Sequence, residues 1–466
     1  MAESAGTPVK TQLAVIGGGP GGYHAAFYAA DLGLQVVLID PAENPGGVCL
    51  YRGCIPSKAL LHVAKVVSEA AESADIGVSF AAPEIDIDKV RSWKNEVIAK
   101  LTGALGMQAD RKNVTRIRGT AKFTGPHTLQ VISVDGAESS LEFEQAILAT
   151  GSRPVMLPGL KPSARIMTST GALDLDDVPA SLLVVGGGYI GLELGSAYAA
   201  LGSEVSVVEM TGGLLPGCDR DLVSVLKRRL DKKFKAIMLN TKVAAVAEEK
   251  DGVTVTFEDK KGSRNETFAK ILVAVGRRPV TDGLGLKTAG IAIDDKGFVK
   301  VDAQRRTSVP RIFAVGDIAS EPMLAHKAYG EADVAAENAA GGKAVYDPRA
   351  IPAVVFTDPE IAWCGLTETE ARAQGRKVRT SKLPWRGNGR TLTLGRDDGL
   401  TKLITDPETG LLLGVALVGP GAGELIAEGV LALEMAATGK DLRHTIHPHP
   451  TLSETLYEAA RMLPRE

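Results

Sequence analysis

Residues 11–22 read TQLAVIGGGPGG, a short apolar run that passes directly into a glycine-rich turn. Such a run is typical of a buried parallel strand, and the alanine-rich stretch that continues to Leu32 is typical of a helix. A second apolar run, 34–40, ends in Asp40. The pattern Gly-x-Gly-x-x-Gly is formed by Gly17, Gly19 and Gly22. This order of strand, turn, helix, strand and acid predicts a dinucleotide-binding βαβ unit.

The same pattern recurs later in the chain. Residues 182–191 read LLVVGGGYIG, and the apolar run at 204–209 ends in Glu209. In each copy the acid follows the last glycine by 18 residues. One such pattern is a weak signal, but here strand, helix and acid accompany both copies. The glycines of the second copy are Gly186, Gly188 and Gly191. The repeat predicts two Rossmann-like domains, each with its own dinucleotide.

Each glycine and each acid has a physical task in such a unit. The first glycine makes the turn, the second lets a pyrophosphate approach the backbone, and the third lets helix and strand pack closely. The helix N-terminus receives the phosphate charge. Asp40 and Glu209 are expected to accept hydrogen bonds from ribose hydroxyls. Because MTGG after Glu209 contains no Lys or Arg, NAD is predicted at the second site rather than NADP. The alternative for Glu209 is a solvated acid at a strand end.

A pair of cysteines follows the first unit. Cys49 and Cys54 lie in GGVCLYRGCIPSK at 46–58, and the other two of the four cysteines, Cys218 and Cys364, are isolated. A cysteine pair beside a nucleotide site indicates a thiol–disulfide couple that exchanges electrons with the cofactor. A purely structural bridge is less favoured, because so short a loop removes little chain entropy.

The spacing of the pair predicts an irregular backbone. Residues five apart in a regular helix rise by about 7.5 Å, which exceeds comfortable disulfide reach. A bridge between Cys49 and Cys54 therefore needs a distorted turn, which Gly53 permits, and Pro56 is expected to open the helix that follows. Thiols near that helix N-terminus favour the thiolate form. A zinc site is the alternative, but it needs two further nearby ligands, and His62 alone does not supply them.

Composition excludes several classes of protein. A length of 466 residues suggests about three domains, and 44% hydrophobic residues with 52 glycines describe an α/β protein rich in tight turns. The net charge of −3 gives no electrostatic reason to expect nucleic acid or an anionic membrane as a partner. No apolar run approaches the roughly 20 residues of a membrane span. The polar start of the chain shows no secretory signal, and the low cysteine count fits a reducing cytosol, so a cytoplasmic location is expected.

The later segments are less explicit. Asp317 ends an apolar run and, taken alone, is more often a helix cap than a cofactor ligand. From about Tyr346 no nucleotide motif occurs, and a capping box at Thr367–Glu370 indicates a helix, so a separate α+β domain is predicted. The predicted strands are 147–152, 251–257, 271–278, 312–317, 353–357, 401–405 and 411–418.

Three of the seven histidines gather near the end of the chain, in HTIHPHPTLSE at 444–454. A His-Pro-His cluster could bind a metal, although the prolines restrict its backbone. It could equally supply a general base, with Glu454 fixing the tautomer of a histidine whose pKa is near neutral. Spacing alone leaves both possibilities open.

Together these residues resemble the pyridine nucleotide–disulfide oxidoreductases over essentially the whole chain, and among them the dihydrolipoamide dehydrogenases, the E3 flavoproteins of 2-oxo acid dehydrogenase complexes. The resemblance implies two Rossmann-like domains and a C-terminal α+β dimerisation domain. The domains implied are FAD-binding 1–152, NAD-binding 153–280, a central segment 281–348 returning to the FAD domain, and an interface domain 349–466. The motifs that carry it are the two glycine patterns, GGVCLYRGCIPSK at 46–58, AVGRRP at 274–279, FAVGD at 313–317 and HPHPTLSE at 447–454.

The resemblance implies roles for individual residues. Cys54 corresponds to the flavin-side cysteine and Cys49 to the interchange thiol. Lys58 corresponds to the lysine near the flavin ring, and Glu193 to the glutamate paired with it. FAD is implied at the first glycine pattern and NAD at the second. The cofactor-binding residues completing these sites are Asp317 on the ribityl chain, and Gly151 and Gly276 at the ends of the strands that close the two domains.

His449 corresponds to the catalytic base and Glu454 to its orienting carboxylate, and this pair is implied to reach the cysteines of the other subunit of a homodimer. The implied reaction is the oxidation of dihydrolipoamide, carried on lipoyl domains, with reduction of NAD⁺. The acyltransferase (E2) core of a complex is the implied partner. Pyruvate, 2-oxoglutarate, branched-chain and glycine-cleavage systems share this chemistry. No metal site is implied.

Related activities were weighed against the sequence. Glutathione reductases usually carry arginines after the second acid, and mercuric reductases usually end in an extra cysteine pair; neither feature is present. A lipoyl-docking flavoprotein with incidental diaphorase activity is disfavoured by the intact cysteines and His449. The chain departs from the common pattern at Tyr51-Arg52, at Val280, at Asp40 in place of Glu, and at Pro448 in place of Ala, which could alter how His449 is presented.

Overall fold

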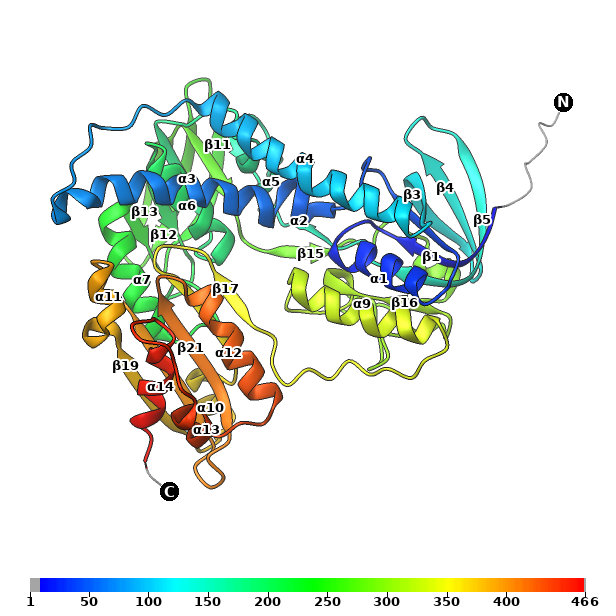
Figure 1. Cartoon of the computed structure of the whole chain (residues 1–466). Helices are drawn as coiled ribbons and strands as arrows, with labels where there is room; N and C mark the ends of the chain where they lie inside the picture. Colours follow the sequence, from blue (N-terminus) through cyan, green and yellow to red (C-terminus); the bar gives the residue numbers. More distant parts are fainter. Residues whose placement is uncertain (1–8, 465–466) are drawn as a thin grey trace. The chain divides into compact units, whose positions relative to one another are not determined.

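The computed structural model describes residues 9–464, which form two compact units (Figure 1). The first unit contains residues 9–56, Arg91–Val155 and Arg277–Asp347. The second contains Ser57–Val90, Met156–Gly276 and residues 348–464. None of the helices in the described range combines the length and the apolar character that a membrane span requires.

The first unit is built on a six-stranded sheet of order β1-β2-β3-β4-β5-β16, in which β1 also pairs with β5. β1, β2, β16 and the adjoining parts of β3 and β5 are parallel, whereas β4 is antiparallel to both neighbours. A short antiparallel pair, β6 with β15, lies outside this sheet. The strands are β1 Val9–Ile16, β2 Val36–Asp40, β3 Thr115–Gly125, β4 Thr128–Ser133, β5 Glu138–Leu148, β6 Ser152–Pro154, β15 Arg277–Pro279 and β16 Ile312–Ala314.

Strand β1 shows how this sheet buries both faces. Leu13 and Val15 point into a cluster shared with helices α1 and α9, which lie side by side (Figure 1). Ala14 and Ile16 lie on the opposite face of β1. There they pack in a second apolar cluster with residues of β3, β4, β5 and helix α8. The helices are α1 Pro20–Asp31, α2 Gly47–Arg52, α4 Ile87–Arg111, α8 Leu286–Ala289, the 3₁₀ turn η2 Gly316–Ile318 and α9 Ala325–Ala339. Two helices belong partly to each unit. Helix α4 begins in the second unit and continues in the first, and α3, Cys54–Glu72, begins in the first unit and continues in the second.

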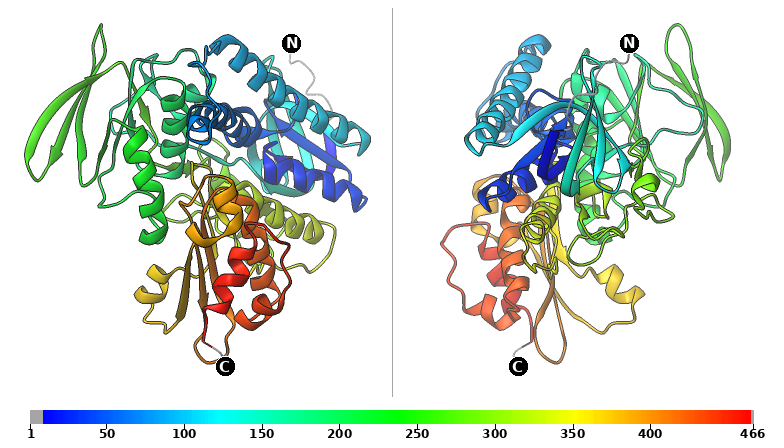
Figure 2. Two further views of the ribbon diagram at one scale, coloured as in Figure 1. Left: turned by 60° about the vertical axis from the view of Figure 1, so that its left-hand side comes forward. Right: turned by 90° about the vertical axis from the view of Figure 1, so that its right-hand side faces the viewer.

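The second unit contains the second nucleotide fold. Its parallel sheet has the order β10-β9-β8-β14-β7, and β11, β12 and β13 form a separate antiparallel sheet, green in Figure 2. The strands are β7 Ile166–Met167, β8 Ser181–Val185, β9 Glu204–Val208, β10 Ala236–Met238, β11 Lys242–Glu248, β12 Val253–Asp259, β13 Gly262–Phe268 and β14 Lys270–Val273. The helices are η1 Ser73–Ile76, α5 Ser169–Asp174, α6 Tyr189–Ala200 and α7 Arg220–Lys233.

The C-terminal part of this unit is an antiparallel sheet of order β17-β18-β21-β20-β19, with α12 and α14 packed against it. The capping box at Thr367–Glu370 is confirmed, because each residue's side chain accepts the backbone N–H of the other. The strands are β17 Ala353–Val355, β18 Glu360–Gly365, β19 Arg379–Pro384, β20 Leu400–Thr405 and β21 Leu412–Gly419. The helices are α10 Glu368–Ala373, η3 Trp385–Gly387, α11 Gly389–Thr393, α12 Ala422–Glu434, α13 Gly439–His444 and α14 Glu454–Arg461.

Several predicted element bounds need correction. The helix expected to open at Pro56 begins at Cys54, since proline is tolerated anywhere in a first turn where no N–H donor is needed. The strand predicted at 147–152 is the end of the longer β5, which stops at Leu148 before Gly151 adopts φ +70°. The run 271–278 divides into β14 and β15 because Gly276 turns the chain at φ +132°.

Candidate active site

The first glycine turn is so tight that side chains are excluded from it. Gly17 has φ +103°, and a Cβ there would lie 2.4 Å from Ala149 O. A Cβ on Gly22 would lie 1.7 Å from Gly17 O, so helix α1 can approach β1 only with glycine at this point. No side chain caps the N-terminus of α1. Its first backbone N–H groups are therefore directed at the turn, where they suit a pyrophosphate.

Asp40 closes this turn from the end of β2. Its Oδ2 accepts the Gly18 N–H at 2.6 Å, and its Oδ1 accepts the Ala42 N–H at 2.9 Å. Each carboxylate oxygen has two lone pairs, so both oxygens keep acceptor capacity for ribose hydroxyls. The acid thus holds the loop in place and keeps free acceptor positions on both oxygens.

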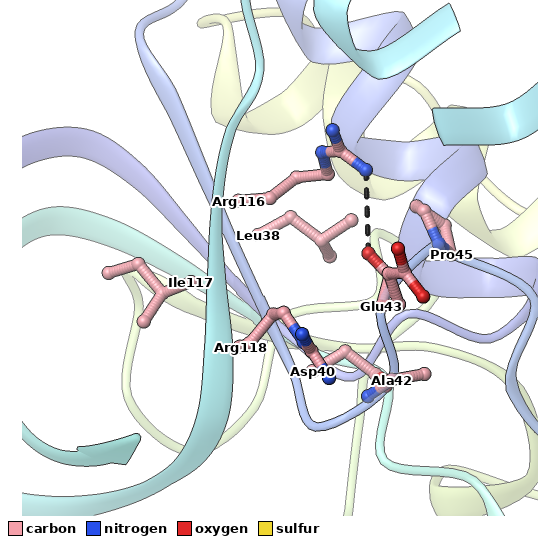
Figure 3. Close-up of a pocket in the computed structure, with 8 residues that line it drawn as sticks. All are labelled: Leu38, Asp40, Ala42, Glu43, Pro45, Arg116, Ile117 and Arg118. Atoms are coloured by element: carbon pink, nitrogen blue, oxygen red, sulfur yellow. Dashed lines mark hydrogen bonds between the residues drawn. The ribbon is translucent and has the colours of Figure 1, made fainter. Parts of the chain in front are cut away.

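A pocket lies beside Asp40 and is shown in Figure 3. Arg116 on β3 donates to Asn44 Oδ1 and Asp110 Oδ1, each at 2.8 Å, which fixes its guanidinium at the rim. Arg118 is the register partner of Asp40 in the neighbouring strand. The lining residues are Leu38, Asp40, Ala42, Glu43, Pro45, Arg116, Ile117 and Arg118. Carboxylate acceptors and guanidinium donors in one pocket suit the sugar and phosphate of a dinucleotide.

The second glycine turn repeats the first. A Cβ on Gly186 would lie 2.5 Å from Ala274 O, and Gly188 has no heavy atom of residues 9–464 within 4 Å of its Cβ position. Glu209 is buried, and its two oxygens accept the N–H groups of Gly187 and Thr211, both at 2.8 Å. Within the described range no Lys or Arg forms an ion pair with Glu209. The residues at this site therefore fit NAD, as the sequence predicts.

The cysteine pair lies where two helices meet. Cys49 is on α2, Cys54 is the first residue of α3, and Gly53 separates them with φ −147° and ψ −115°. A Cβ on Gly53 would lie 2.8 Å from Val48 O, so this junction requires glycine. The predicted distorted turn is present. Cys49 is half-buried and Cys54 is exposed.

The other two cysteines lie in a different environment. Cys218 and Cys364 are buried, and burial raises the pKa of each thiol to about 12. Neither forms a thiolate near neutral pH. The redox role therefore belongs to Cys49 and Cys54.

Two tyrosines that share an apolar cluster with Cys49 were not predicted from the sequence. Tyr23 on α1 and Tyr329 on α9 share a hydrogen bond of 2.5 Å between their hydroxyl groups. Both contribute to the apolar cluster in which Cys49 packs. Burial is the main cause of the raised pKa of each phenol, and the charges of Cys49 and Cys54 raise it further.

Lys58 and Glu193 are paired as the resemblance implies. Lys58 Nζ lies 2.8 Å from Glu193 Oε2, and the side chain of Glu193 is buried. Ser57 Oγ donates to the same oxygen at 3.1 Å, and the Phe356 N–H donates to Glu193 Oε1 at 3.0 Å. Sequence reasoning missed Ser57 and Phe356, since each is more than 130 positions from Glu193.

Asp317 lies within the turn η2 and caps no helix. Its Oδ2 accepts the hydroxyl of Ser152, and Arg277 donates to the same hydroxyl oxygen and to Ser152 O, both at 2.8 Å. Glu331 accepts the Gly316 N–H at 2.6 Å and fixes the turn from α9. An acid held in this way offers its remaining lone pairs to a polyol chain.

The histidine motif forms the predicted pair. His449 Nδ1 lies 2.9 Å from Glu454 Oε1 although Pro448 precedes it, and Glu454 Oε2 accepts the Thr451 N–H at 2.8 Å. The Thr451 amide and then His449 lower the pKa of Glu454. The side chain of His449 is 78% exposed, and its Nδ1 is the nitrogen that faces Glu454. His447 is engaged with Glu428 at 2.7 Å.

A metal centre at the histidines is not supported by the geometry. Within residues 9–464 the only group of three potential metal ligands is Asp219, Asp221 and Glu368, and the ammonium of Lys402 lies among them. The general-base interpretation of the histidine motif is therefore the one that the geometry favours.

Comparison with known proteins identifies the family of this chain. The family described as pyridine nucleotide-disulphide oxidoreductase matches residues 11–332, and its dimerisation domain matches residues 351–460. The chain belongs to this family, and its predicted fold class is confirmed. It therefore couples a pyridine nucleotide to disulfide chemistry, and its C-terminal domain is of the dimerising type.

Individual relatives are similar over nearly the full length. The chain is 48% identical to the dihydrolipoyl dehydrogenase of Vibrio parahaemolyticus over 97% of its length and 96% of that protein. It is 48% identical to that of Thermus scotoductus over 97% of each chain. Among solved structures, LpdA from Mycobacterium tuberculosis superimposes with a TM-score of 0.90 at 31% identity, covering 98% of this chain and all of that one.

Proposed function

We propose that this protein is an NAD-dependent, FAD-containing dihydrolipoyl dehydrogenase, which oxidises dihydrolipoamide on lipoyl domains and reduces NAD⁺. The observation that carries the proposal is that three features occur together in one chain. They are a cysteine pair at a helix junction, a histidine oriented by a carboxylate, and two copies of the glycine-rich nucleotide turn. The similarity to dihydrolipoyl dehydrogenases over 97% of the chain supports the same conclusion.

The thiol half-reaction follows from the properties of the residues. His449 Nε2 takes a proton from one thiol of dihydrolipoamide, while Glu454 on Nδ1 stabilises the imidazolium that forms. The thiolate attacks the Cys49 sulfur, the Cys49–Cys54 bond breaks, and Cys54 leaves as thiolate. The second substrate thiol then attacks the substrate sulfur bonded to Cys49; the bond to Cys49 breaks, and the proton of this thiol passes to the departing Cys49 sulfur. Lipoamide is released, and the protein holds a dithiol carrying the two electrons.

FAD, when bound at the first site, supplies the two-electron carrier between this dithiol and NAD⁺. The residues proposed to hold it are the first glycine turn, Asp40, Gly151 and Asp317. Lys58, paired with Glu193, is proposed to present its ammonium to the flavin ring. The residues proposed to hold NAD are Gly186, Gly188, Gly191, Glu209 and Gly276.

The domain assignment is part of the proposal. Residues 1–152 and 281–348 are assigned to FAD, 153–280 to NAD, and 349–466 to the dimer interface. Because the family's histidine pair serves the partner subunit's cysteines, a homodimer with two shared sites is proposed. The partner complex is proposed to present lipoyl domains on an acyltransferase core. A cytoplasmic location is proposed, because a dithiol that cycles with NADH suits a compartment in which thiols stay reduced.

The test is a direct comparison of substrates with the FAD-loaded dimer. Turnover of dihydrolipoamide with NAD⁺ is expected to exceed that of oxidised glutathione or Hg(II) with NADPH by at least about 100-fold in kcat/KM. Cys54→Ser serves as the matched control, since it should bind FAD and give no turnover. Equal or better turnover of glutathione or Hg(II) would contradict the proposal.

A further inference from the structure

The ammonium of Lys58 is held by two groups. Glu193 Oε2 lies 2.8 Å from Nζ, and the ring centroid of Phe356 lies 4.3 Å from the same atom. A cation at this distance from an aromatic face is attracted by the quadrupole of the ring. The side chain of Lys58 is 33% exposed to solvent, whereas that of Glu193 is 3% exposed. The lysine therefore reaches from a buried anchor toward an accessible space.

Phe356 contacts both members of this ion pair. Its ring lies against Lys58, and its backbone N–H donates to Glu193 Oε1 at 3.0 Å. Ser57 donates to the oxygen of Glu193 that Lys58 uses. Glu193 thus receives hydrogen bonds on both oxygens and cannot rotate away from the lysine without losing them.

The ring of Phe356 is not required to fill the core. Its neighbours Val354 and Val355 pack in the apolar clusters of the second unit, while Phe356 is half-buried and belongs to none of the clusters found in residues 9–464. Phe356 follows β17, in the part of the chain that matches the dimerisation domain, whereas Lys58 and Glu193 belong to the nucleotide-binding match. The dimerisation domain therefore contributes to the lysine site of its own chain.

Counting the donors of Lys58 shows what the ring achieves. An ammonium has three N–H groups. Glu193 accepts one, and the ring occupies a second direction, which leaves the third for a ligand. We infer that Phe356 is a positioning residue for the proposed reaction: its ring fixes the direction of the remaining Lys58 N–H, and its amide fixes the carboxylate that anchors the lysine. This inference rests on the proposed function, in which Lys58 faces the flavin.

The test uses two variants that both preserve the backbone N–H. Phe356→Leu removes the ring and keeps an apolar side chain, and Phe356→Tyr keeps the ring. In the FAD-loaded dimer, Phe356→Leu is expected to lower kcat with lipoamide about 3- to 30-fold, the range of a partly desolvated cation–ring contact. The KM for NAD⁺ should not change. Phe356→Tyr should recover most of the lost kcat, because its ring presents the same face.

A double-mutant cycle separates positioning from a general structural effect. If the ring acts through Lys58, then Phe356→Leu should cost nothing further in a Lys58→Met background. The flavin midpoint potential gives a second readout that needs no turnover. It should fall in Phe356→Leu and Lys58→Met, and the double variant should match Lys58→Met alone.

The outcomes distinguish this inference from the proposed function. The role of Phe356 would be overturned if the losses of kcat and of flavin potential in the double variant equalled the sum of the losses in the two single variants. It would also be overturned if Phe356→Tyr lost as much kcat as Phe356→Leu. If lipoamide is turned over while Phe356→Leu leaves both readouts unchanged, only the inference fails. If lipoamide is not a substrate but the two potentials are coupled as described, the positioning role stands and the proposed substrate fails.

Discussion

Replacing Lys402 by Met tests how the C-terminal domain is attached to the second nucleotide fold. Lys402 lies on β20 with no exposed side-chain surface. Its Nζ lies 2.8 Å from Asp219 Oδ2, 2.7 Å from Asp221 Oδ1 and 2.7 Å from Glu368 Oε2. Asp219 directly precedes α7, and Asp221 is the second residue of that helix. Lys402 and Glu368 belong to the C-terminal sheet domain. One buried cation therefore joins carboxylates from both parts.

The magnitude follows from burial. Removing one partner of a buried ion pair leaves uncompensated charge and costs about 3–5 kcal/mol. Met fills a similar volume without the ammonium, so the loss of packing is small. The free energy of unfolding is expected to fall by about 3–5 kcal/mol at pH 7, a large effect for one substitution.

Lys382 provides the matched control. Its Nζ lies 2.9 Å from Asp221 Oδ2 and 2.8 Å from Glu368 Oε2, but its side chain is 43% exposed. An ion pair open to solvent contributes about 0–1 kcal/mol. Lys382→Met therefore removes contacts with two of the same carboxylates and should cost at most about 1 kcal/mol.

The pH dependence has a definite sign. Burial opposes ionisation of Asp221 and Glu368, but the hydrogen bonds from Lys402 and Lys382 outweigh it and lower the pKa of both carboxyls. A lowered pKa contributes stability above the unfolded carboxyl values of about 4, which is lost as the pH falls through the folded value. Without Lys402 this contribution is reduced. The difference in the free energy of unfolding between Lys402→Met and the parent should be fully present at pH 7 and should shrink only as the pH falls below about 4, through the lowered folded pKa values.

Equilibrium urea unfolding followed by tryptophan fluorescence measures this difference. Trp385 is fully buried, and its indole N–H donates to Thr401 Oγ1 at 2.8 Å, next to Lys402 in the sequence. Its emission therefore reports on the packing of β20. Equal losses in Lys402→Met and Lys382→Met, or a loss that stays the same when the pH falls from 7 to well below about 4, would refute the argument from burial.

Three further predictions concern the chemistry. Cys49→Ser should retain FAD and lose lipoamide turnover. It should leave a Cys54 thiolate beside oxidised flavin, which is visible as a long-wavelength charge-transfer band. If that band appeared in Cys54→Ser and not in Cys49→Ser, the roles of the two cysteines would be reversed. NAD should exceed NADP by at least about 100-fold in kcat/KM, because a 2′-phosphate would face the Glu209 carboxylate, and comparable efficiency would contradict this. A doubly tagged heterodimer of Cys49→Ser and His449→Gln chains should regain up to about half of native activity, since one site pairs intact groups from both chains; activity no higher than in either parent homodimer would reject the shared site.

Much of the site could be predicted because it is encoded in short stretches. The two glycine turns, the cysteine junction and the His449–Glu454 pair each lie within about 25 residues, where spacing and backbone geometry constrain the contact directly. Gly53 was expected to permit a distorted turn, and its surroundings admit no Cβ. The chemistry of these groups therefore follows from the sequence once the local backbone is known.

The remaining contacts could not be predicted, because they join positions far apart in the chain. Tyr23 meets Tyr329 across 306 positions, and Phe356 meets Glu193 across 163. No local pattern distinguishes such an aromatic residue from one that simply fills the core. Lys402 illustrates the same limit, since the sequence LTKLIT of β20 gives no sign that its lysine is buried against three carboxylates.

The two acids of the nucleotide turns have a structural task before any ligand is bound. Asp40 and Glu209 each accept two backbone N–H groups. One comes from the residue between the first two glycines of the pattern, Gly18 or Gly187, and the other from the residue two beyond the acid. Replacing Glu209 by Ala would remove a ribose acceptor and also release the loop that holds the pyrophosphate. Gln keeps one oxygen for the Gly187 N–H, while its NH₂ group cannot accept from Thr211. The loop therefore selects a carboxylate for its own stability, and preference for an unphosphorylated ribose follows from the charge that this carboxylate brings.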